Sequence, residues 1–560
     1  LVNEFPANQR YYQRLKNVLR NAARYNDLLQ VIENHLIQNP NDIQSLVELG
    51  NVQLALGRKD QALSIWESIL SRFPGNLMAQ RLVLTHLFTN NLADEGSGLL
   101  NRLREDRNNP SFFALEMGRL HAARLNYDDA IDEFLLHLSS QPQAINNITG
   151  QLLGFPAEPE ILAMFREKLT GYGSPEATRI LASVEFKHRN FSRVVELYRQ
   201  MNASPQELLQ IGLDLMAESE WDLTQQLMEQ RLADPEAVPQ YEQAIMTLAS
   251  IYEARSIADQ VHFPLSGFYQ DSRFFVLPFI RVDEPQLNSL RQAMTLYDSL
   301  ITTWRNPRAR LRLGDIKYLI LDDFDGAIND FEGVIMNRSA GRFHPPALLR
   351  MVDLWIAKGN LEAAAEACRQ AEARLKTTDQ LNRVEVKAVE LLLLSGDRDS
   401  LLVYVGGQLA ALGPADPYFN DLMELQRLVL RFEDWPAQYE AFVQSEFLLR
   451  QNRRSEAIAL LAASLEDELT PVSPILQYRL AHLHALQGNH GEAEGLSLAI
   501  PGTSEFSELG LLLAAELADY LLGNTTAAST RYLSFLDAYP LSVHSDAVRL
   551  RYRALNPEVD

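Results

Sequence analysis

Residues 43–74 read IQSLVELGNVQLALGRKDQALSIWESILSRFP, and this stretch decides the fold. Its apolar residues recur three or four positions apart in two runs, 46–54 and 62–69, which predicts two amphipathic helices. Gly57 separates the runs and Pro74 ends the second one, and both residue types are typical of helix ends. The stretch therefore predicts a helical hairpin.

The hairpin recurs along the chain at a nearly constant period. Pro40, Pro74, Pro110 and Pro142 follow one another at intervals of 34, 36 and 32 residues. A period of this size indicates a solenoid of stacked repeats, because one hairpin cannot bury its apolar faces without its neighbours. The sequence therefore predicts an all-α solenoid, in which length measures the extent of surface and not the number of separate cores.

The pattern resembles the tetratricopeptide repeat, in which a small residue of the first helix faces a large residue of the second. In that family an alanine comes four positions before the large residue, and a proline closes the unit. Gly50, Ala62, Trp66 and Pro74 occupy these four places. The other matches are Gly118, Ala130, Phe134 and Pro142; Ala182, Val194 and Tyr198; Gly314, Ala327 and Phe331; Gly359, Ala364 and Cys368; Ala481, Gly488 and Ala493; and Gly523, Ala528, Tyr532 and Pro540. The resemblance implies a right-handed superhelix of helix-turn-helix repeats.

The pattern divides the chain into four segments. We predict an N-terminal repeat block at 1–150, a second block at 151–255, an irregular insertion at 256–287 and a C-terminal block at 288–560. The second block follows the glycine- and proline-containing stretch GQLLGFPAEPE, which we interpret as a loop. Residues 75–108 and 401–450 depart most from the repeat pattern.

The insertion is unusually aromatic. Pro264 and Pro278 block a continuous helix, and FFVLPFI could form an extended segment or a short strand. Two hypotheses remain open for its aromatic residues: a hydrophobic plug between two solenoid halves, or a docking element for a partner, since clustered aromatics anchor interfaces. The residues proposed for docking are Phe263, Phe268, Tyr269, Phe274 and Phe275, with Phe279 completing the cluster.

Composition and charge exclude several classes of protein. Asp and Glu outnumber Lys and Arg by 73 to 51, a formal net charge of -22, which repels nucleic acid and anionic lipid. Hydrophobic residues make up 46%, a globular value, yet no apolar run approaches the roughly 18 residues that span a bilayer. The sequence contains no P-loop, nucleophile elbow, dinucleotide fingerprint or His-Glu-x-x-His. We expect no catalytic residues and no cofactor.

One segment imitates a calcium loop. Residues 321–332, LDDFDGAINDFE, match an EF-hand loop at most places, but Leu321 stands where the first ligating aspartate belongs. The segment coincides with the turn of the repeat that contains Gly314 and Phe331. We therefore interpret Asp325 or a neighbour as a helix cap and predict no calcium.

Two histidine-containing clusters also suggest metal sites by composition alone. Acidic residues at the start of one predicted helix favour a solvated face that complements the helix N-terminus. Histidines two positions apart face different sides of a helix, which argues against a shared metal. We therefore expect no metal at either cluster. The clusters are Asp128, Asp129, Asp132 and Glu133 beside His121 and His137, and His482, His484 and His490.

Two features bear on the compartment. Cys368, the only cysteine, allows no internal disulfide and occupies a core position of the second helix, so we expect a buried, unreactive thiol. The last repeat, YLSFLDAYPLSVHSDAVR, is similar to repeats of bacterial outer-membrane assembly lipoproteins and Tol-Pal accessory proteins through Tyr539, Pro540, Ser542 and Ala547. Since the sequence starts at Leu1 and not at Met, either a signal or lipid-anchor segment has been removed or the sequence is part of a longer chain, and an extracytoplasmic location is favoured over a cytoplasmic one.

These features favour a non-catalytic scaffold that binds protein or peptide partners. The family resemblance implies a concave binding face lined by the first helices. Val47 and Asn51 match only half of the carboxylate clamp of chaperone-tail adaptors. A regulatory or substrate-recruiting subunit of an enzyme stays open as the alternative. The predicted contact residues of the concave face are Asn51, Phe112, Arg119, Arg179 and Tyr520.

Overall fold

The computed structural model describes residues 9–232, 240–257, 261–467 and 469–557. Over these residues the secondary structure is helical, with no strand assigned, and most helices pack in antiparallel pairs joined by short turns. The all-α repeat solenoid predicted from the sequence is confirmed. The chain divides into two compact units, residues 1–203 and 204–560.

Unit 1 (residues 1–203) is a run of helical hairpins. The pairs α3–α4, α5–α6, α7–α8 and α11–α12 pack within themselves. α3 and α4 contact α5, while α9 and α10 connect α8 to α11. Its helices are α1 (Gln9–Asn21), α2 (Tyr25–Gln38), α3 (Ile43–Ala55), α4 (Lys59–Arg72), α5 (Leu77–Thr89), α6 (Ala93–Asp106), α7 (Ala114–Ala123), α8 (Tyr127–Ser140), α9 (Ile145–Leu153), α10 (Pro159–Tyr172), α11 (Pro175–Lys187) and α12 (Phe191–Gln200), with a 3-10 turn at Pro142–Ala144.

Close approach of paired helices requires a missing side chain at the contact. A Cβ atom on Gly118 would lie 2.6 Å from the ring of Phe134, and the same atom on Gly314 would lie 2.7 Å from the ring of Phe331. At the contact between Gly50 and Trp66, the indole N–H also donates to the carbonyl of Val47 at 3.2 Å. The glycine–aromatic pairs therefore fix the distance between the two helices of a repeat.

The degenerate segment 75–108 still forms a hairpin, α5–α6. Here the small and large residues have exchanged helices, because Phe88 lies in the last turn of the first helix and Gly96 lies on the second. A Cβ on Gly96 would lie 3.0 Å from the Phe88 ring. The contact is preserved with its order reversed.

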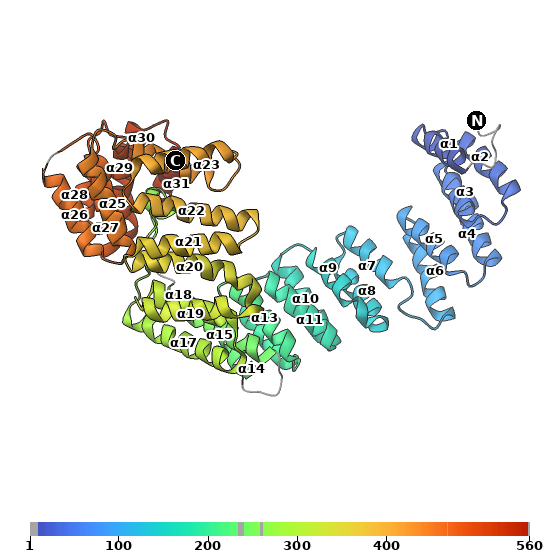
Figure 1. The fold of residues 1–560 in the computed structure, drawn as a ribbon. Coiled ribbons are helices and arrows are strands. Elements are labelled where there is room, and N and C mark those ends of the chain that lie inside the picture. The colour runs from blue at the N-terminus through green and yellow to red at the C-terminus, as the bar shows by residue number, and fades with distance from the viewer. Residues whose placement is uncertain (1–8, 233–239, 258–260, 468, 558–560) are drawn as a thin grey trace. The chain divides into compact units, whose positions relative to one another are not determined.

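Unit 2 (residues 204–560) continues the same architecture, and Figure 1 shows α17 to α22 stacked one upon the next. Its helices are α13 (Pro205–Ala217), α14 (Trp221–Leu232), α15 (Gln240–Ser256), α16 (Phe268–Asp271), α17 (Glu284–Trp304), α18 (Pro307–Leu319), α19 (Phe324–Met336), α20 (His344–Ala357), α21 (Leu361–Arg374), α22 (Thr378–Leu394), α23 (Arg398–Ala411), α24 (Phe419–Leu430), α25 (Pro436–Arg450), α26 (Arg454–Asp467), α27 (Ser473–Gln487), α28 (His490–Leu498), α29 (Phe506–Glu516), α30 (Thr525–Ala538) and α31 (Ser545–Leu555). A 3-10 segment at Arg338–Phe343 and a π-helical turn at Leu517–Leu521 complete the unit.

The predicted insertion is the connection between α15 and α17, which pack against each other as the two helices of one repeat. We call its residues 261–283 the internal segment. Apart from the short α16 it is irregular, and Figure 1 shows it as a green trace beside α25. Its amide at Ile280 donates to the carbonyl of Leu319 at 2.8 Å, but no ladder forms, so FFVLPFI is not a strand.

The block boundary predicted at 150/151 falls inside α9, which ends at Leu153. Only residues 154–158 of the predicted loop are irregular, and α10 begins at Pro159. The two compact units meet further along the chain, at 203/204.

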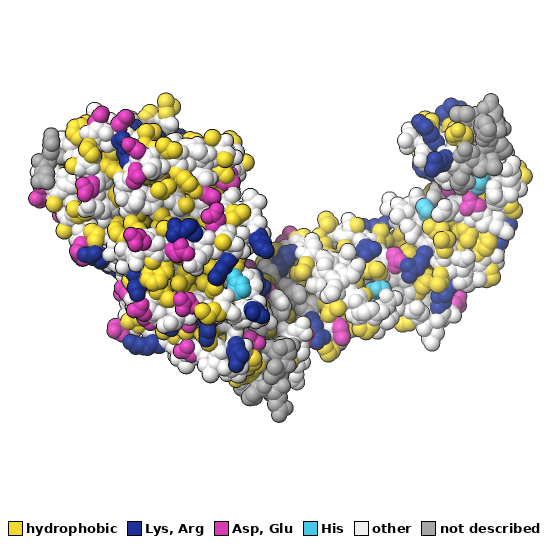
Figure 2. Space-filling model, viewed as in Figure 1, with side chains coloured by type: hydrophobic (Ala, Val, Ile, Leu, Met, Phe, Trp, Pro, Cys, Tyr) yellow, Lys and Arg dark blue, Asp and Glu magenta, His cyan; other side chains and the backbone are white. Residues whose placement is uncertain are grey.

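The surface carries no segregated charge on the face shown in Figure 2, where cationic, anionic and hydrophobic side chains alternate over both units. Among the described helices, none combines the length and the apolar character needed to cross a membrane.

Candidate binding groove

The first helices of successive repeats in unit 2 form a continuous row. α20 contacts α22, and both contact α25, while α27 contacts α29. We call the surface made by α18, α20, α22, α25, α27 and α29, together with Arg454 at the start of α26, the inner face. Side chains one repeat apart in sequence meet across this row.

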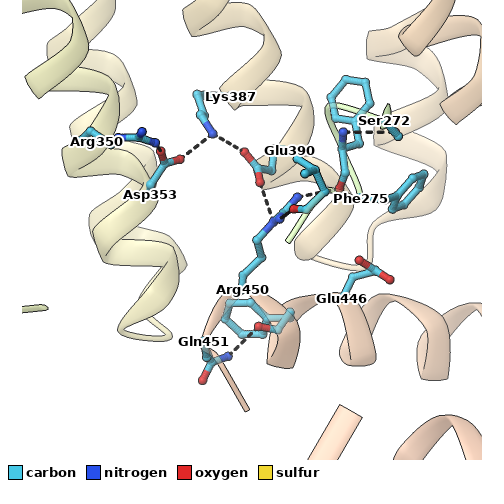
Figure 3. Close-up of polar contacts among 12 residues, drawn as sticks. Ser272, Phe275, Arg350, Asp353, Lys387, Glu390, Glu446, Arg450 and Gln451 are labelled. Atoms are coloured by element: carbon cyan, nitrogen blue, oxygen red, sulfur yellow. Dashed lines mark hydrogen bonds and ion pairs between the residues drawn. The ribbon is translucent and has the colours of Figure 1, made fainter. Parts of the chain in front are cut away.

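A ladder of alternating charges runs along the inner face (Figure 3). From α18 to α20, the guanidinium of Arg350 donates to Asp315 at 2.8 Å. From α20 to α22, the ammonium of Lys387 lies 2.5 Å from Asp353. From α22 to α25, Arg450 lies 2.8 Å from Glu390. We call this set the charge ladder.

The ladder follows from one spacing repeated on three helices. A basic residue precedes an acidic residue by three positions in Arg312–Asp315, Arg350–Asp353 and Lys387–Glu390, at distances of 2.9, 3.3 and 2.7 Å. This spacing puts both side chains on one face of a helix. Each acidic residue can then bond its own helix and the next one.

The charges of the ladder support one another. Burial raises the pKa of Asp353, but the neighbouring Lys387 and Arg350 outweigh this effect, so the net pKa is lowered. Burial lowers the pKa of Lys387, but the carboxylates of Asp353 and Glu390 outweigh this effect, so the net pKa is raised. These groups are therefore ionised at neutral pH, and removing one leaves its partners as uncompensated charges.

The inner face already holds a stretch of polypeptide, the internal segment. Arginines of α25 to α27 bind its backbone carbonyls. Arg450 donates to the carbonyls of Phe274, at 2.7 Å, and Val276. Arg479 donates to Phe275 at 2.9 Å, and Arg454 donates to Phe279 at 2.8 Å. These contacts recognise main chain and not side-chain identity.

The start of the internal segment is anchored on α27 and α29. The carboxylate of Glu516 accepts the amides of Leu265 at 2.8 Å and Ser266 at 2.9 Å. The hydroxyl of Tyr478 donates to the carbonyl of Ser266 at 2.5 Å. Both backbone donors and backbone acceptors of the segment thus find partners on the inner face.

A buried ion pair supports this anchorage. Arg479 is 0% exposed and binds both oxygens of Glu446, which is 2% exposed, at 2.7 and 2.8 Å. Its guanidinium also lies 4.3 Å from the ring centre of Tyr269. The pair fixes the arginine that binds Phe275.

An open groove lies beside the internal segment, over α18, α20 and α22. Its volume is about 700 Å³, and a neighbouring cavity of about 230 Å³ shares five of its lining residues. We call the two together the inner-face groove. The shared residues are Arg273, Val276, Arg350, Asp353 and Lys387. Neither this groove nor the charge ladder was predicted from the sequence, although the basic–x–x–acidic spacing at 312, 350 and 387 was a usable signal.

The structure buries most of the aromatic residues proposed for docking. Phe263, Tyr269, Phe274 and Phe275 are 0 to 2% exposed and join the core formed with the C-terminal repeats. Buried rings offer no surface to a partner, so the partner-binding prediction is corrected at these four positions. Only Phe268 is partly exposed, and its ring packs edge-on against Phe506.

The other predicted contact residues are not among the lining residues of this groove. In unit 1, Asn51 bonds His86 at 3.1 Å, and Phe112 is buried beneath the guanidinium of Arg107. Arg119 is exposed on α7, and Arg179 is half-buried on α11. In unit 2, Tyr520 is exposed beside Arg551. Their role in partner binding stays a prediction.

The acidic metal candidates have local explanations in the fold. Lys168 lies 3.0 Å from Asp128 and 2.5 Å from Asp132, so the exposed acidic cluster holds an ammonium. In the calcium-like loop, Asp323 caps α19 by accepting the amide of Gly326, and Asp325 pairs with Lys358. The helix cap is therefore Asp323 and not Asp325.

The histidine cluster is dispersed. His482 is fully buried against the rings of Phe263 and Tyr269. His484 lies on the same helix within 3.3 Å of the Asn489 amide, and His490 begins α28. The proximity in sequence does not bring these imidazoles to one point.

Comparisons with known proteins identify the repeat. Tetratricopeptide repeat family models match residues 44–76 and 447–502. No curated protein matches the chain. A solved tetratricopeptide repeat protein from Parabacteroides merdae is 12% identical, with 63% of this chain and 98% of that chain covered and a TM-score of 0.27. Yeast Tom70 is 13% identical, with 98% and 93% covered and a TM-score of 0.26.

Proposed function

We propose that this chain, as a tetratricopeptide repeat protein, is a non-catalytic scaffold. It binds a non-helical segment of a partner protein in the inner-face groove. Tetratricopeptide repeat proteins generally mediate protein–protein interactions and are typically non-catalytic. The proposal adds which surface of this chain receives the partner.

One observation carries the proposal: the inner face already binds a polypeptide backbone. Arg450, Arg454 and Arg479 bind four carbonyls of the internal segment, and Glu516 binds two of its amides. The groove adjoins the internal segment, because Arg273 and Val276 of that segment line it. A partner segment in the groove would extend a mode of binding that the fold already uses. Its volume lies within the range typical of binding pockets.

Hydrogen exchange with a purified partner tests the proposal. Affinity purification of the full chain from its source cells identifies proteins present in stoichiometric amounts. We expect such a partner to protect amides of α18, α20 and α22 more than those of α19 and α21. Protection confined to α19 and α21 would contradict binding in the groove.

A matched pair of variants checks the location. Val386 lines the groove on α22, whereas Val403 is 78% exposed on α23 and does not line it. Val386→Asp should reduce recovery of the partner, and Val403→Asp should leave it unchanged. Equal recovery with both variants would place the interaction elsewhere.

The compartment and the type of complex are part of the proposal. Tyr539, Pro540, Ser542 and Ala547 support a role in a bacterial cell-envelope assembly through their similarity to envelope repeat proteins. Cell fractionation tests this point, and recovery of the chain in the cytoplasmic fraction alone would refute it. The alternative, a recruiting subunit of an enzyme complex, requires that the stoichiometric partner be an enzyme.

A further inference from the structure

We infer that the inner-face groove selects a partner segment rich in acidic residues. This inference rests on the proposed function and specifies the chemistry of the partner. Three features support it: the solvent exposure of the groove's cations, the apolar surface between the charges, and the contrast with the net charge of the whole chain.

Three cations of the groove are more exposed than the carboxylates of the ladder. Arg273, Arg350 and Lys387 are 47%, 34% and 22% exposed, whereas Asp315 and Asp353 are 7% and 11% exposed. The carboxylates lie behind the guanidinium groups, where they hold the ladder together. An approaching ligand therefore meets cationic donors first, and Arg guanidinium groups bind carboxylates in a bidentate geometry.

The outer rim adds one more cation and one exposed carboxylate. Arg383 is 56% exposed and pairs at 3.2 Å with Asp379, which is 69% exposed on the same helix. Such an exposed pair contributes little to stability and exchanges readily for a better partner. Over the lining residues of both cavities, five are cationic and four are acidic. Of the four acidic residues, only Asp379 is more than 11% exposed.

Between the charges, the groove offers contacts for short apolar groups. Val276 is 40% exposed, and Leu349 and Val386 are half-buried. A non-helical segment that alternates acidic and small side chains could place its carboxylates against the arginines and its other side chains on these residues. The net charge of -22 repels polyanions in general, which favours a partner with local acidic groups over nucleic acid.

Binding of short synthetic peptides to the full chain tests the inference. The probes are rhodamine-labelled octapeptides that alternate Thr with Glu, Gln or Lys, since Thr disfavours helix formation. An octathymidylate oligonucleotide serves as the nucleic-acid probe. Fluorescence anisotropy should show the tightest binding for the Glu peptide, with affinity falling as salt rises, because salt screens exposed charges.

Three variants locate the site. Arg383→Gln should weaken binding of the Glu peptide about fivefold, and Asp379→Asn should strengthen it about twofold, because each changes one exposed charge of the rim. Arg369→Gln is the matched control, since Arg369 is 67% exposed and pairs with Glu366 on α21, outside the groove. It should change nothing. None of these side chains belongs to the charge ladder.

The outcomes separate the inference from the proposed function. Equal binding of the Gln and Glu peptides, still weakened by Val386→Asp, would overturn the acidic preference and leave the groove as a peptide site. Binding of octathymidylate as tight as that of the Glu peptide, or the absence of any effect of Arg383→Gln, would also overturn it. Failure of the proposed function is seen independently, in the absence of protection of α18, α20 and α22 by a purified partner.

Discussion

The buried pair Arg479–Glu446 yields a quantitative prediction for the anchorage of the internal segment. Arg479→Met leaves the carboxylate of Glu446 buried without a counter-charge and frees the carbonyl of Phe275. Glu446→Leu leaves the guanidinium buried instead. Breaking a buried pair from one side costs about 3–5 kcal/mol, so each single substitution should destabilise α27 by that amount.

The double substitution should cost far less than the sum of the two single ones. It removes both charges, and what remains is the loss of the bond to Phe275, about 1–3 kcal/mol, and of the cation–π contact with Tyr269, about 2 kcal/mol. Apolar replacements regain part of this cost. We therefore expect the double variant to be no less stable than Arg479→Met alone.

Native-state hydrogen exchange of the full chain at pH 7 measures these costs as opening free energies of peptides from residues 263–280 and 473–487. The control is Arg453→Met, because Arg453 forms an exposed pair with Glu456 and should contribute less than about 1 kcal/mol. If the two single costs simply add in the double variant, the two charges are independent and the reasoning fails.

Three further outcomes follow from individual side chains. Gly118→Ala should destabilise the α7–α8 hairpin by about 1–3 kcal/mol in hydrogen-exchange measurements, since the added methyl overlaps Phe134. Gly98 is exposed with no atom close to it, so the control Gly98→Ala should stabilise α6 by about 0.5–1 kcal/mol. Destabilisation by both substitutions would refute the contact. Burial, with a smaller effect of Arg479, holds the pKa of His482 well below 6.5, so the folded state disfavours protonation. The free energy of unfolding should therefore fall by about 1.4 kcal/mol for each pH unit below 6.5. A His482→Leu variant whose free energy of unfolding falls with the same slope would contradict this. Burial raises the pKa of Cys368 to about 11, so iodoacetamide at pH 7.5 should alkylate it about 100-fold more slowly than a free thiol, and equal rates in mass spectrometry would show an accessible thiolate.

The repeat was predictable because its signal is local. Gly118 and Phe134 meet within one hairpin, and their spacing recurs in other repeats. The same contact escapes recognition where its chemistry changes. In α13–α14 the large residue that covers Gly212 is Met228, and in α5–α6 the glycine and the aromatic residue exchange helices. Packing requires only a gap and a side chain to fill it, and several residue pairs meet that need.

The groove was less predictable because its residues meet only after the repeats stack. Within one helix, Arg350 and Asp353 look like an ordinary surface pair. Their importance comes from Asp315 and Lys387 on neighbouring first helices. The internal segment is a stronger case, since no pattern at Phe275 indicates that its carbonyl binds Arg479, 204 residues later.

That distance has a consequence during synthesis. The internal segment leaves the ribosome long before α27 and α29 exist, and at about 5–20 residues per second the delay between Phe275 and Arg479 is roughly 10–40 s. During this time the rings of Phe263, Tyr269 and Phe274 have no core to enter. The nascent chain thus carries an exposed aromatic stretch until its last repeats emerge. Exposed surface of this kind favours aggregation, so completion of the fold is linked to completion of translation.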